Sequence, residues 1–171
     1  MNGVVPVENW QARGRIFPRF KRYGPIKPTM RQENHFKGAL LMYMLDTNTL
    51  IYFFKGMGQV DKNLFAHAPK DIFISSIVVY ELQVGIEKSS NSHKREKQFA
   101  ALLEQINVLA FAEQEARAAA YIRSALEKKG TPIGPIDVLI AGSAKAHDLT
   151  LVTHNTKEFE RVEGLKLEDW F

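Results

Sequence analysis

The stretch MYMLDTNTLIYFF, residues 42–54, decides the fold because it joins a short apolar strand to a helix through one acidic residue. YMLD, 43–46, has the character of a buried strand, and TNTLIYFFKG, 47–56, that of a helix that ends at a glycine. Asp46 stands at the junction, with apolar segments on both sides. Burying a lone carboxylate is costly unless it has a partner. The identity of that partner is the first question that the sequence raises.

Downstream of this stretch, strand and helix signals alternate along the chain. Strands that are separated by helices favour a parallel sheet with both faces covered. The sequence therefore predicts an α/β fold with a central, mainly parallel sheet. We predict further strands at 71–75, 107–111 and 149–153, an edge strand at 165–170, and helices at 60–68, 76–89, 92–106, 112–130 and 135–148.

The composition restricts the classes of protein and of site. With 171 residues, 45% of them hydrophobic, the chain fits one ordinary domain with its own core. It contains no cysteine, which excludes disulfides, thiolate catalysis and cysteine-based zinc or iron–sulfur sites. No apolar run approaches the ~18 residues of a membrane span, and the N-terminus lacks the apolar core of a secretory signal. We expect a soluble, cytoplasmic protein without membrane contact.

The basic character of the chain belongs to its first part. Residues 1–41 carry eight Lys or Arg against two acids, a net charge of +6, whereas residues 42–171 carry fifteen against seventeen, a net charge of −2. This leader also holds four of the seven prolines and has no helical or strand periodicity. It is either an electrostatic arm for nucleic acid or upstream sequence translated from a misassigned start. We favour the misassigned start, because the strand pattern of the folded part, residues 42–171, begins abruptly at Met42.

Three acidic residues are predicted to lie at one edge of the sheet. Asp46 ends the first strand, Glu81 lies about one turn into the helix after the second, and Asp137 opens a helix that is predicted to be buried. The tripeptide THN, 153–155, follows the fourth strand. In open α/β sheets the ligand site is the crevice beyond the carboxyl ends of the strands. We therefore expect the three carboxylates to meet in one pocket.

Each of these acids also has a structural explanation. Asp46 fits a helix cap, Glu81 a solvated side chain, and Asp137 an acid that complements a helix dipole. Together these explanations weaken, because three neighbouring carboxylates repel one another unless a cation is present. Carboxylate and amide ligands suit Mg²⁺ or Mn²⁺ rather than zinc. Such an ion activates water and stabilises the developing charge in phosphodiester hydrolysis.

Neighbouring polar residues are candidates for supporting roles. We expect Asn48 to hydrogen-bond and orient the Asp46 carboxylate, and Thr153 either to do the same or to position the attacking water. His67, His93 and His147 share no ligand spacing, and we assign them no metal role. His154 is explained best as a partly exposed loop residue. The run HKREK, 93–97, and the pair Lys128 and Lys129 either contact phosphates or form solvated helix faces.

Three segments carry a resemblance to a known family. MLDTN, ISSIVVYELQVGIEKS and GTPIGPIDVLIAGSAKAHDLTLVTHNTKEFERVEGLKLEDW resemble the PIN-domain ribonuclease toxins of VapBC toxin–antitoxin systems, and the resemblance extends over residues 42–171. It implies a PIN-like three-layer α/β/α sandwich. It also implies a Mg²⁺- or Mn²⁺-dependent endoribonuclease toxin, a homodimer, that cleaves structured RNA such as tRNA and is silenced by a VapB-type antitoxin.

By motif, the resemblance assigns Asp46, Glu81 and Asp137 as the catalytic and metal-binding acids. Many PIN domains carry a fourth acid after the fourth strand, where this chain has Asn155. An amide supplies no charge, so one metal ion is the safer expectation. Asn155 either contacts a ligand, water or phosphate, or caps the helix that follows.

Rival classes fit less well. A phosphatase of the haloacid dehalogenase type needs D-x-D, but residue 48 is asparagine. The sequence also lacks both Gly-rich phosphate-binding motifs, G-x-x-x-x-G-K-[ST] and G-x-G-x-x-G. A non-catalytic RNA-binding module with a PIN-like fold remains the alternative, and it would bind RNA without cleaving it even when Mn²⁺ is present.

Overall fold

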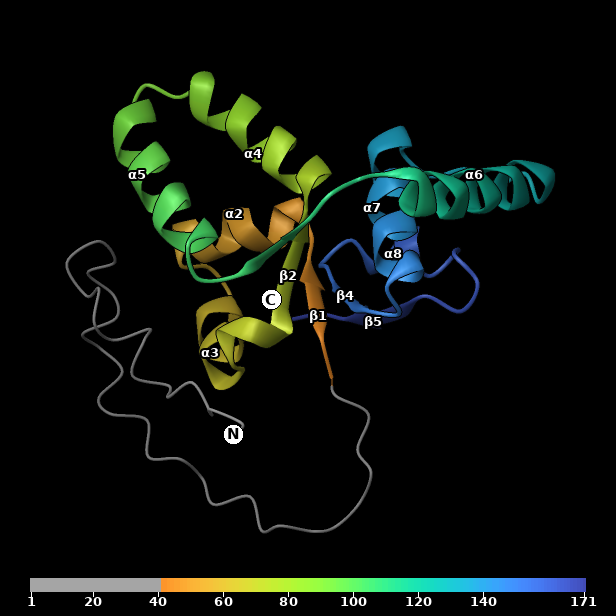
Figure 1. The fold of residues 1–171 in the computed structure, drawn as a ribbon, viewed down its shortest axis with the longest axis horizontal. Coiled ribbons are helices and arrows are strands. Elements are labelled where there is room, and N and C mark those ends of the chain that lie inside the picture. The colour runs from red at the N-terminus through yellow and green to blue at the C-terminus, as the bar shows by residue number, and fades with distance from the viewer. Residues whose placement is uncertain (1–40) are drawn as a thin grey trace, which may run out of the picture.

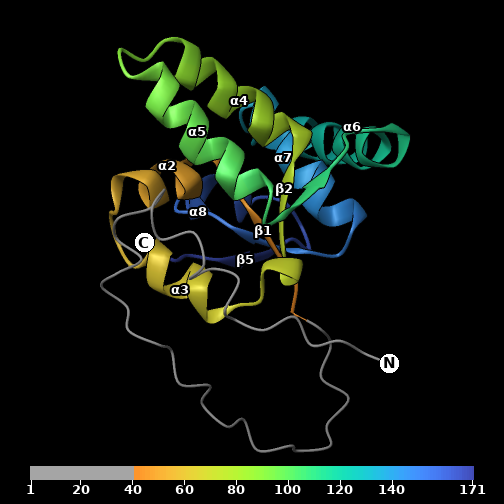
Figure 2. The ribbon, with the colours of Figure 1, turned by 60° about the vertical axis from the view of Figure 1, so that its left-hand side comes forward.

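The computed structural model describes residues 41–171 (Figure 1 and Figure 2). Apart from Leu41, the leader and its predicted properties lie outside the described residues. The five strands form one sheet in the order β3-β2-β1-β4-β5, and every neighbouring pair is parallel. This confirms the predicted α/β fold with a parallel sheet. The strands are β1 Tyr43–Leu45, β2 Ile72–Ser75, β3 Asn107–Leu109, β4 Thr150–Val152 and β5 Lys166–Glu168.

Helices cover both faces of this sheet. Figure 1 shows α2 to α5 on one side of the strands and α6 to α8 on the other, so the three predicted layers are present. A short 3₁₀ helix, η2, was not predicted. The helices are α2 Thr47–Lys55, α3 Val60–Ala66, η2 Pro69–Asp71, α4 Ser76–Glu87, α5 Ser92–Leu103, α6 Glu113–Lys128, α7 Pro135–Ala146 and α8 Thr156–Phe159. In the described part of the chain, no helix is long and apolar enough to cross a membrane.

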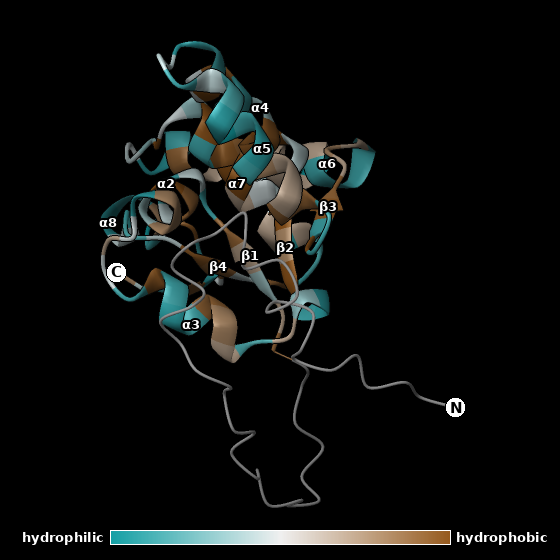
Figure 3. Ribbon diagram, turned by 90° about the vertical axis from the view of Figure 1, so that its left-hand side faces the viewer, coloured by the Kyte–Doolittle hydropathy of each residue, from teal (hydrophilic) through white to brown (hydrophobic). Residues whose placement is uncertain are grey.

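The core lies where the central strands meet the helices. All residues of β1 and β4 are buried, and Figure 3 shows hydrophobic colours along the strands and hydrophilic colours on outward-facing parts of α3 and α6. Helices α6 and α7 pack closely through small residues. A Cβ atom on Gly142 would lie 2.6 Å from the Cβ of Ala119, so this helix pair tolerates no larger residue there.

Hydrogen bonds fix the carboxyl end of the sheet, where the helices begin. The Thr49 hydroxyl donates to the Val152 carbonyl at 2.8 Å, which ties α2 to β4. The Ser75 hydroxyl accepts from the Val78 amide at 3.3 Å and caps α4. Each helix therefore starts at a defined position relative to its strand, and side chains in the first turns are held beside the strand ends.

Candidate active site

Asp46 occupies the junction between β1 and α2, and the residue is 3% exposed. Oδ1 accepts from the Thr47 amide at 2.8 Å, so the carboxylate does cap the helix. Oδ2 accepts from the Thr153 hydroxyl at 2.9 Å. The cap explanation is therefore correct but incomplete, because a second hydrogen bond from β4's far end fixes the orientation of the same side chain.

The environment of Asp46 disfavours its charged form. Burial raises the pKa of this carboxyl from 3.8 to about 6, against the lowering effect of the hydrogen bonds from Thr153 and Thr47, and the charges of Asp137 and Glu81 raise it further. None of the ion pairs within residues 41–171 includes any of these three acids. Within residues 41–171, the site is thus a group of mutually repelling carboxylates that form no ion pair with a cationic side chain.

Asp137 lies in the first turn of α7, where the helix dipole favours an acid. Burial raises the pKa of its carboxyl, and the charges of Glu81 and Glu158 add to this effect. Gly134 makes room for the carboxylate, since a Cβ atom at that residue would lie 2.8 Å from Asp137 Oδ2. The sequence GPID therefore serves both the start of the helix and the placement of the acid.

Glu81 reaches the same region from α4. Its Oε2 accepts a hydrogen bond from the Thr47 hydroxyl at 2.5 Å. Thr47 thus connects two acids, because its amide donates to Asp46 and its hydroxyl to Glu81. The structure brings Asp46, Glu81 and Asp137 within electrostatic reach of one another, as the sheet topology predicts.

The protein contacts predicted for Asn48 and Asn155 are not found among residues 41–171, and the alternative contact of Asn155 with a ligand, water or phosphate stays a prediction. The predicted hydrogen bond from Asn48 to Asp46 is wrong, since Asn48 is exposed and the carboxylate instead accepts from Thr47 and Thr153. Asn155 occupies the N-cap position of α8, but its side chain makes no capping hydrogen bond. Its backbone amide donates to the Thr153 hydroxyl at 3.0 Å, so Asn155 helps to fix Thr153 and its contribution there comes from the backbone.

Two residues of this region escaped the sequence analysis. Thr47 was overlooked although it follows Asp46 directly in the motif DTN. Glu158 lies in α8, near enough to raise the pKa of Asp137, and it pairs with Arg161 at 3.5 Å. The signal for Glu158 was its place three residues after Asn155, one helical turn along, which brings an acid back to the end of the fourth strand.

Three of the histidines contact residues other than the three acids of the site. His67 stacks on Trp170 with ring centroids 5.4 Å apart. His147 contacts Glu115 at 2.6 Å, and His154 contacts Asp169 at 2.9 Å.

The donor set of the acidic site suits a hard divalent cation. Carboxylate oxygens without sulfur are ligands for Mg²⁺ or Mn²⁺, and Mg²⁺ commonly uses one or two carboxylates together with water. Within residues 41–171, no three histidine or acidic side chains stand close enough to enclose an ion. The hydrogen bond from Thr47 holds Glu81 Oε2. The arrangement therefore fits an ion held by few protein ligands rather than a closed three-carboxylate cage.

Comparisons with known proteins agree with this geometry. Residues 43–165 match the family model of the PIN domain. The tRNA(fMet)-specific endonuclease VapC of Salmonella typhimurium is 38% identical over 131 residues, which cover 77% of this chain and 99% of that protein. DNA-bound VapBC from the same organism superposes with a TM-score of 0.72 at 38% identity, over 77% of this chain and 99% of that one. VapBC2 from Rickettsia felis, bound to a fragment of promoter DNA, superposes with a TM-score of 0.70 at 36% identity, over 77% of this chain and 100% of that one.

Proposed function

The chain belongs to the PIN-domain family of VapC ribonucleases, and on this premise we propose that it hydrolyses RNA with a divalent metal ion at Asp46, Glu81 and Asp137. The observation that carries the proposal is Asp46. This buried carboxylate has a pKa raised to about 6 beside two further acids, and it forms no ion pair within residues 41–171. Such an arrangement is a common property of functional sites.

The residues divide the work as follows in this proposal. Asp46 and Asp137 hold the metal ion, and Thr153 fixes the Asp46 carboxylate through its hydroxyl. A bound Mg²⁺ or Mn²⁺ lowers the pKa of a water ligand and neutralises charge that develops on the phosphate. Thr47 holds Oε2 of Glu81, which leaves Oε1 to accept a hydrogen bond from the attacking water.

RNA cleavage by the full chain tests this proposal. We expect cleavage with Mg²⁺ or Mn²⁺ and its loss in excess EDTA. Cleavage that EDTA leaves undiminished would contradict the metal-dependent mechanism. Binding of RNA without any cleavage, even with Mn²⁺, would favour the alternative of a non-catalytic RNA-binding module.

We propose structured RNA, with tRNA as the first candidate, as the substrate class. The support is the similar Salmonella protein, whose name specifies tRNA(fMet). Mapping the cut sites in total RNA after a brief pulse of expression identifies the target. Cuts that are spread over unstructured RNA, with tRNA intact, would contradict this choice.

We further propose a VapB-type antitoxin as partner, since the similar solved structures are VapBC complexes. A cavity of about 470 Å³ beside the site suits such a partner. Helices α2, α4 and α5 line it with apolar side chains, with Lys55, Lys94 and Arg95, and with Glu81 itself. An apolar antitoxin segment fits this groove, and an Arg or Lys from it would neutralise the acids.

Gly85 allows a direct test of the antitoxin groove. It lines the cavity, and a Cβ atom there meets no neighbour within 4 Å. We expect Gly85→Leu to fill the groove and to weaken the complex with the neighbouring short reading frame's product, measured by co-purification and by rescue of growth. Undisturbed rescue would contradict this docking site.

Sedimentation of the purified chain then tests the predicted homodimer.

A further inference from the structure

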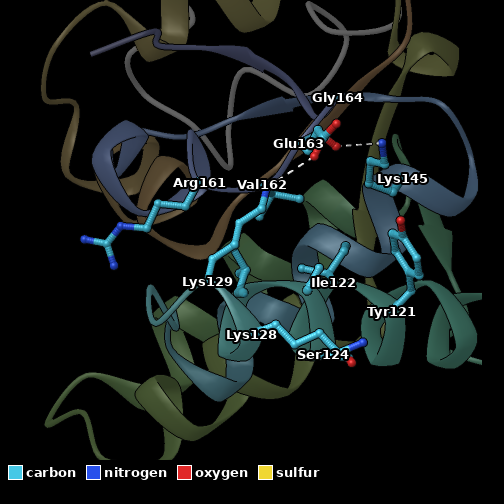
Figure 4. A pocket seen from close by; sticks show the side chains of 12 residues that line it. Tyr121, Ile122, Ser124, Lys128, Lys129, Lys145, Arg161, Val162, Glu163 and Gly164 are labelled. Carbon is cyan, nitrogen blue, oxygen red and sulfur yellow. Dashed lines mark hydrogen bonds and ion pairs between the residues drawn. The ribbon is translucent and has the colours of Figure 1, made fainter.

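A second cavity, of about 700 Å³, lies between the C-terminal half of α6, the last turn of α7 and the segment 161–164 (Figure 4). We call it the α6–α7 cavity. Its floor contains the buried side chains of Ile122, Leu126 and Val162. Four cationic side chains line it against one acid: Lys128, Lys129, Lys145 and Arg161 against Glu163. This is a local concentration of positive charge, because residues 42–171 carry fifteen Lys or Arg against seventeen acids.

The single acid neutralises little of this charge. Glu163 pairs with Lys129 at 3.3 Å, but both side chains are largely exposed, and such surface pairs are weak. Lys145 instead donates to the backbone carbonyl of Glu163 at 3.0 Å and forms no ion pair within residues 41–171. The segment turns at Gly164, with a φ of 69°. Lys128 forms no ion pair within the described residues.

Lys145 is held in place by its surroundings. A Cβ atom on Gly164 would lie 3.1 Å from Lys145 Nζ, so the glycine leaves space for the ammonium group beside the turn. Figure 4 shows Lys145 and Tyr121 on one side of the cavity and Arg161 on the opposite side. Tyr121 is 78% exposed. An exposed aromatic ring between cationic groups is the combination that nucleic acids recognise, phosphates on the cations and bases on the ring.

Arg161 connects this cavity to the acidic site. Its guanidinium donates to the Pro132 carbonyl at 3.0 Å and pairs with Glu158 at 3.5 Å. Glu158 lies within electrostatic reach of Asp137. The Arg161 end of the α6–α7 cavity is therefore linked to Glu158, whose charge acts on Asp137, and Figure 4 shows Lys145 and Tyr121 on the opposite side of the cavity.

We infer that the α6–α7 cavity binds the phosphate backbone of the RNA substrate beyond the cleaved bond, with Lys128 and Lys145 on phosphates and Tyr121 against a base. The inference rests on the proposed function and deepens it. A structured RNA reaches from the acids past Arg161 into the cavity, whereas a very short oligonucleotide does not. Recognition through phosphates is independent of sequence and dependent on salt.

Binding of tRNA as a function of salt tests the inference, with Asp46→Asn in every protein to prevent cleavage. We expect the pair Lys128→Gln and Lys145→Gln to weaken binding about tenfold at low salt and to flatten the salt slope by about 1.5, because each lost phosphate contact contributes ~0.7 to 0.9. The matched control is Lys62→Gln with Lys70→Gln, the same charge change on exposed residues of α3 and η2. It should change the affinity less than twofold.

A third variant separates the two kinds of contact. Tyr121→Ala should lower the affinity about fivefold at every salt concentration and leave the slope unchanged, because stacking releases no counterions. Identical binding by the lysine pair and its control would overturn the inference. The inference is equally overturned if the lysine pair leaves RNA binding intact and weakens an antitoxin complex, since the cavity then binds protein. A parent chain that cleaves no RNA contradicts the proposed function instead, so the two failures are distinguishable.

Discussion

Two buried carboxylates of this protein, Asp46 and Glu115, have opposite environments. They are 3% and 4% exposed. Glu115 lies in the first turn of α6, where its Oε2 accepts from the Ala112 amide at 2.8 Å and its Oε1 contacts His147 at 2.6 Å. Its own backbone amide, the Ala112 amide and His147 hold the pKa of Glu115 below its usual value. The pKa of Asp46 is instead raised to about 6, by burial first and then by neighbouring acids.

We interpret this difference as one between a structural charge at Glu115 and the proposed metal-binding charge at Asp46. Glu115 has partners on both oxygens, including a histidine, and its charged form stabilises the start of α6. Asp46 has two hydrogen bonds as well, but like charges face it and no cation pairs with it within residues 41–171. A buried acid whose repulsion is left uncompensated costs stability. A bound cation removes that cost, and so burial alone does not distinguish the two roles.

The largest expected effect is the loss of activity in Asp46→Asn. The amide keeps the shape and can still accept from Thr47 or Thr153, but it removes the charge that attracts the metal ion. We expect RNA cleavage to fall by about two to four orders of magnitude, a range typical of groups that act on the reacting centre. Initial rates with saturating Mn²⁺ measure this. Asp137→Asn should behave alike, and parent-like rates in either variant would show that these acids only cap helices.

Next is the pH dependence of stability without metal. When folding raises the pKa of a carboxyl, its protonated form stabilises the folded state, and this contribution is complete below the pKa of the unfolded state. For Asp46 that pKa is 3.8, and the contribution is lost as the pH rises through about 6. For Asp46 the loss amounts to about 3 kcal/mol. Urea unfolding in EDTA between pH 4.5 and 7.5 should therefore show a decline in the parent that Asp46→Asn largely removes. Equal slopes in the two proteins would contradict the raised pKa.

Glu115 should respond to pH in the opposite sense. Its pKa is lowered by folding, so its contribution is present above its ordinary pKa and is lost as the pH falls below that value. Glu115→Gln, the same carboxylate-to-amide change as in Asp46→Asn, should lower the free energy of unfolding at pH 7 by about 1 kcal/mol, because charge-assisted hydrogen bonds become neutral ones. Its RNA cleavage should match the parent at 25 °C. A large loss of activity would show that Glu115 is more than structural.

The smallest expected effect on activity comes from filling the space that Gly134 leaves beside the Asp137 carboxylate. Serine caps a helix at least as well as glycine, so Gly134→Ser should leave the thermal midpoint nearly unchanged. Its Cβ atom would lie 2.8 Å from Asp137 Oδ2 and displace the carboxylate. We expect a threefold to tenfold fall in kcat/KM, about 1 kcal/mol in transition-state stabilisation. Full activity would mean that the exact position of this carboxylate is unimportant.

The nearness of the three acids to one another could be predicted from the sequence, because the order of strands and helices decides where each strand ends. Asp46, Glu81 and Asp137 follow or adjoin helix starts, and a parallel sheet places those starts at one edge. Among the side-chain contacts, the hydrogen bond from Thr153 to Asp46 was one of the predicted alternatives, whereas the one from Thr47 to Glu81 was not predicted. Asn48 and Thr153 are equally plausible partners for Asp46 by residue type, but the Asn48 side chain is exposed, whereas the Thr153 hydroxyl donates to the carboxylate.

Packing in three dimensions explains the remaining differences. The charge of Glu158 raises the pKa of Asp137 from the short helix α8, and the only sign of this in the sequence is its position one helical turn after Asn155. The α6–α7 cavity likewise joins Lys128 and Lys129 to Lys145 and Arg161. These residues are far apart along the chain, and only the close packing of α6 on α7 brings them to one surface.

We propose that Asp46, which forms no ion pair within residues 41–171, binds a divalent cation. Thermal unfolding of the parent, Asp46→Asn and Glu115→Gln across a Mn²⁺ titration tests it most directly, because a ligand that binds the folded state raises its midpoint. We predict that the midpoint rises with Mn²⁺ for the parent and for Glu115→Gln, whereas Asp46→Asn starts higher without metal and gains little. A parent that Mn²⁺ does not stabilise, or an equal gain in all three proteins, would contradict the claim.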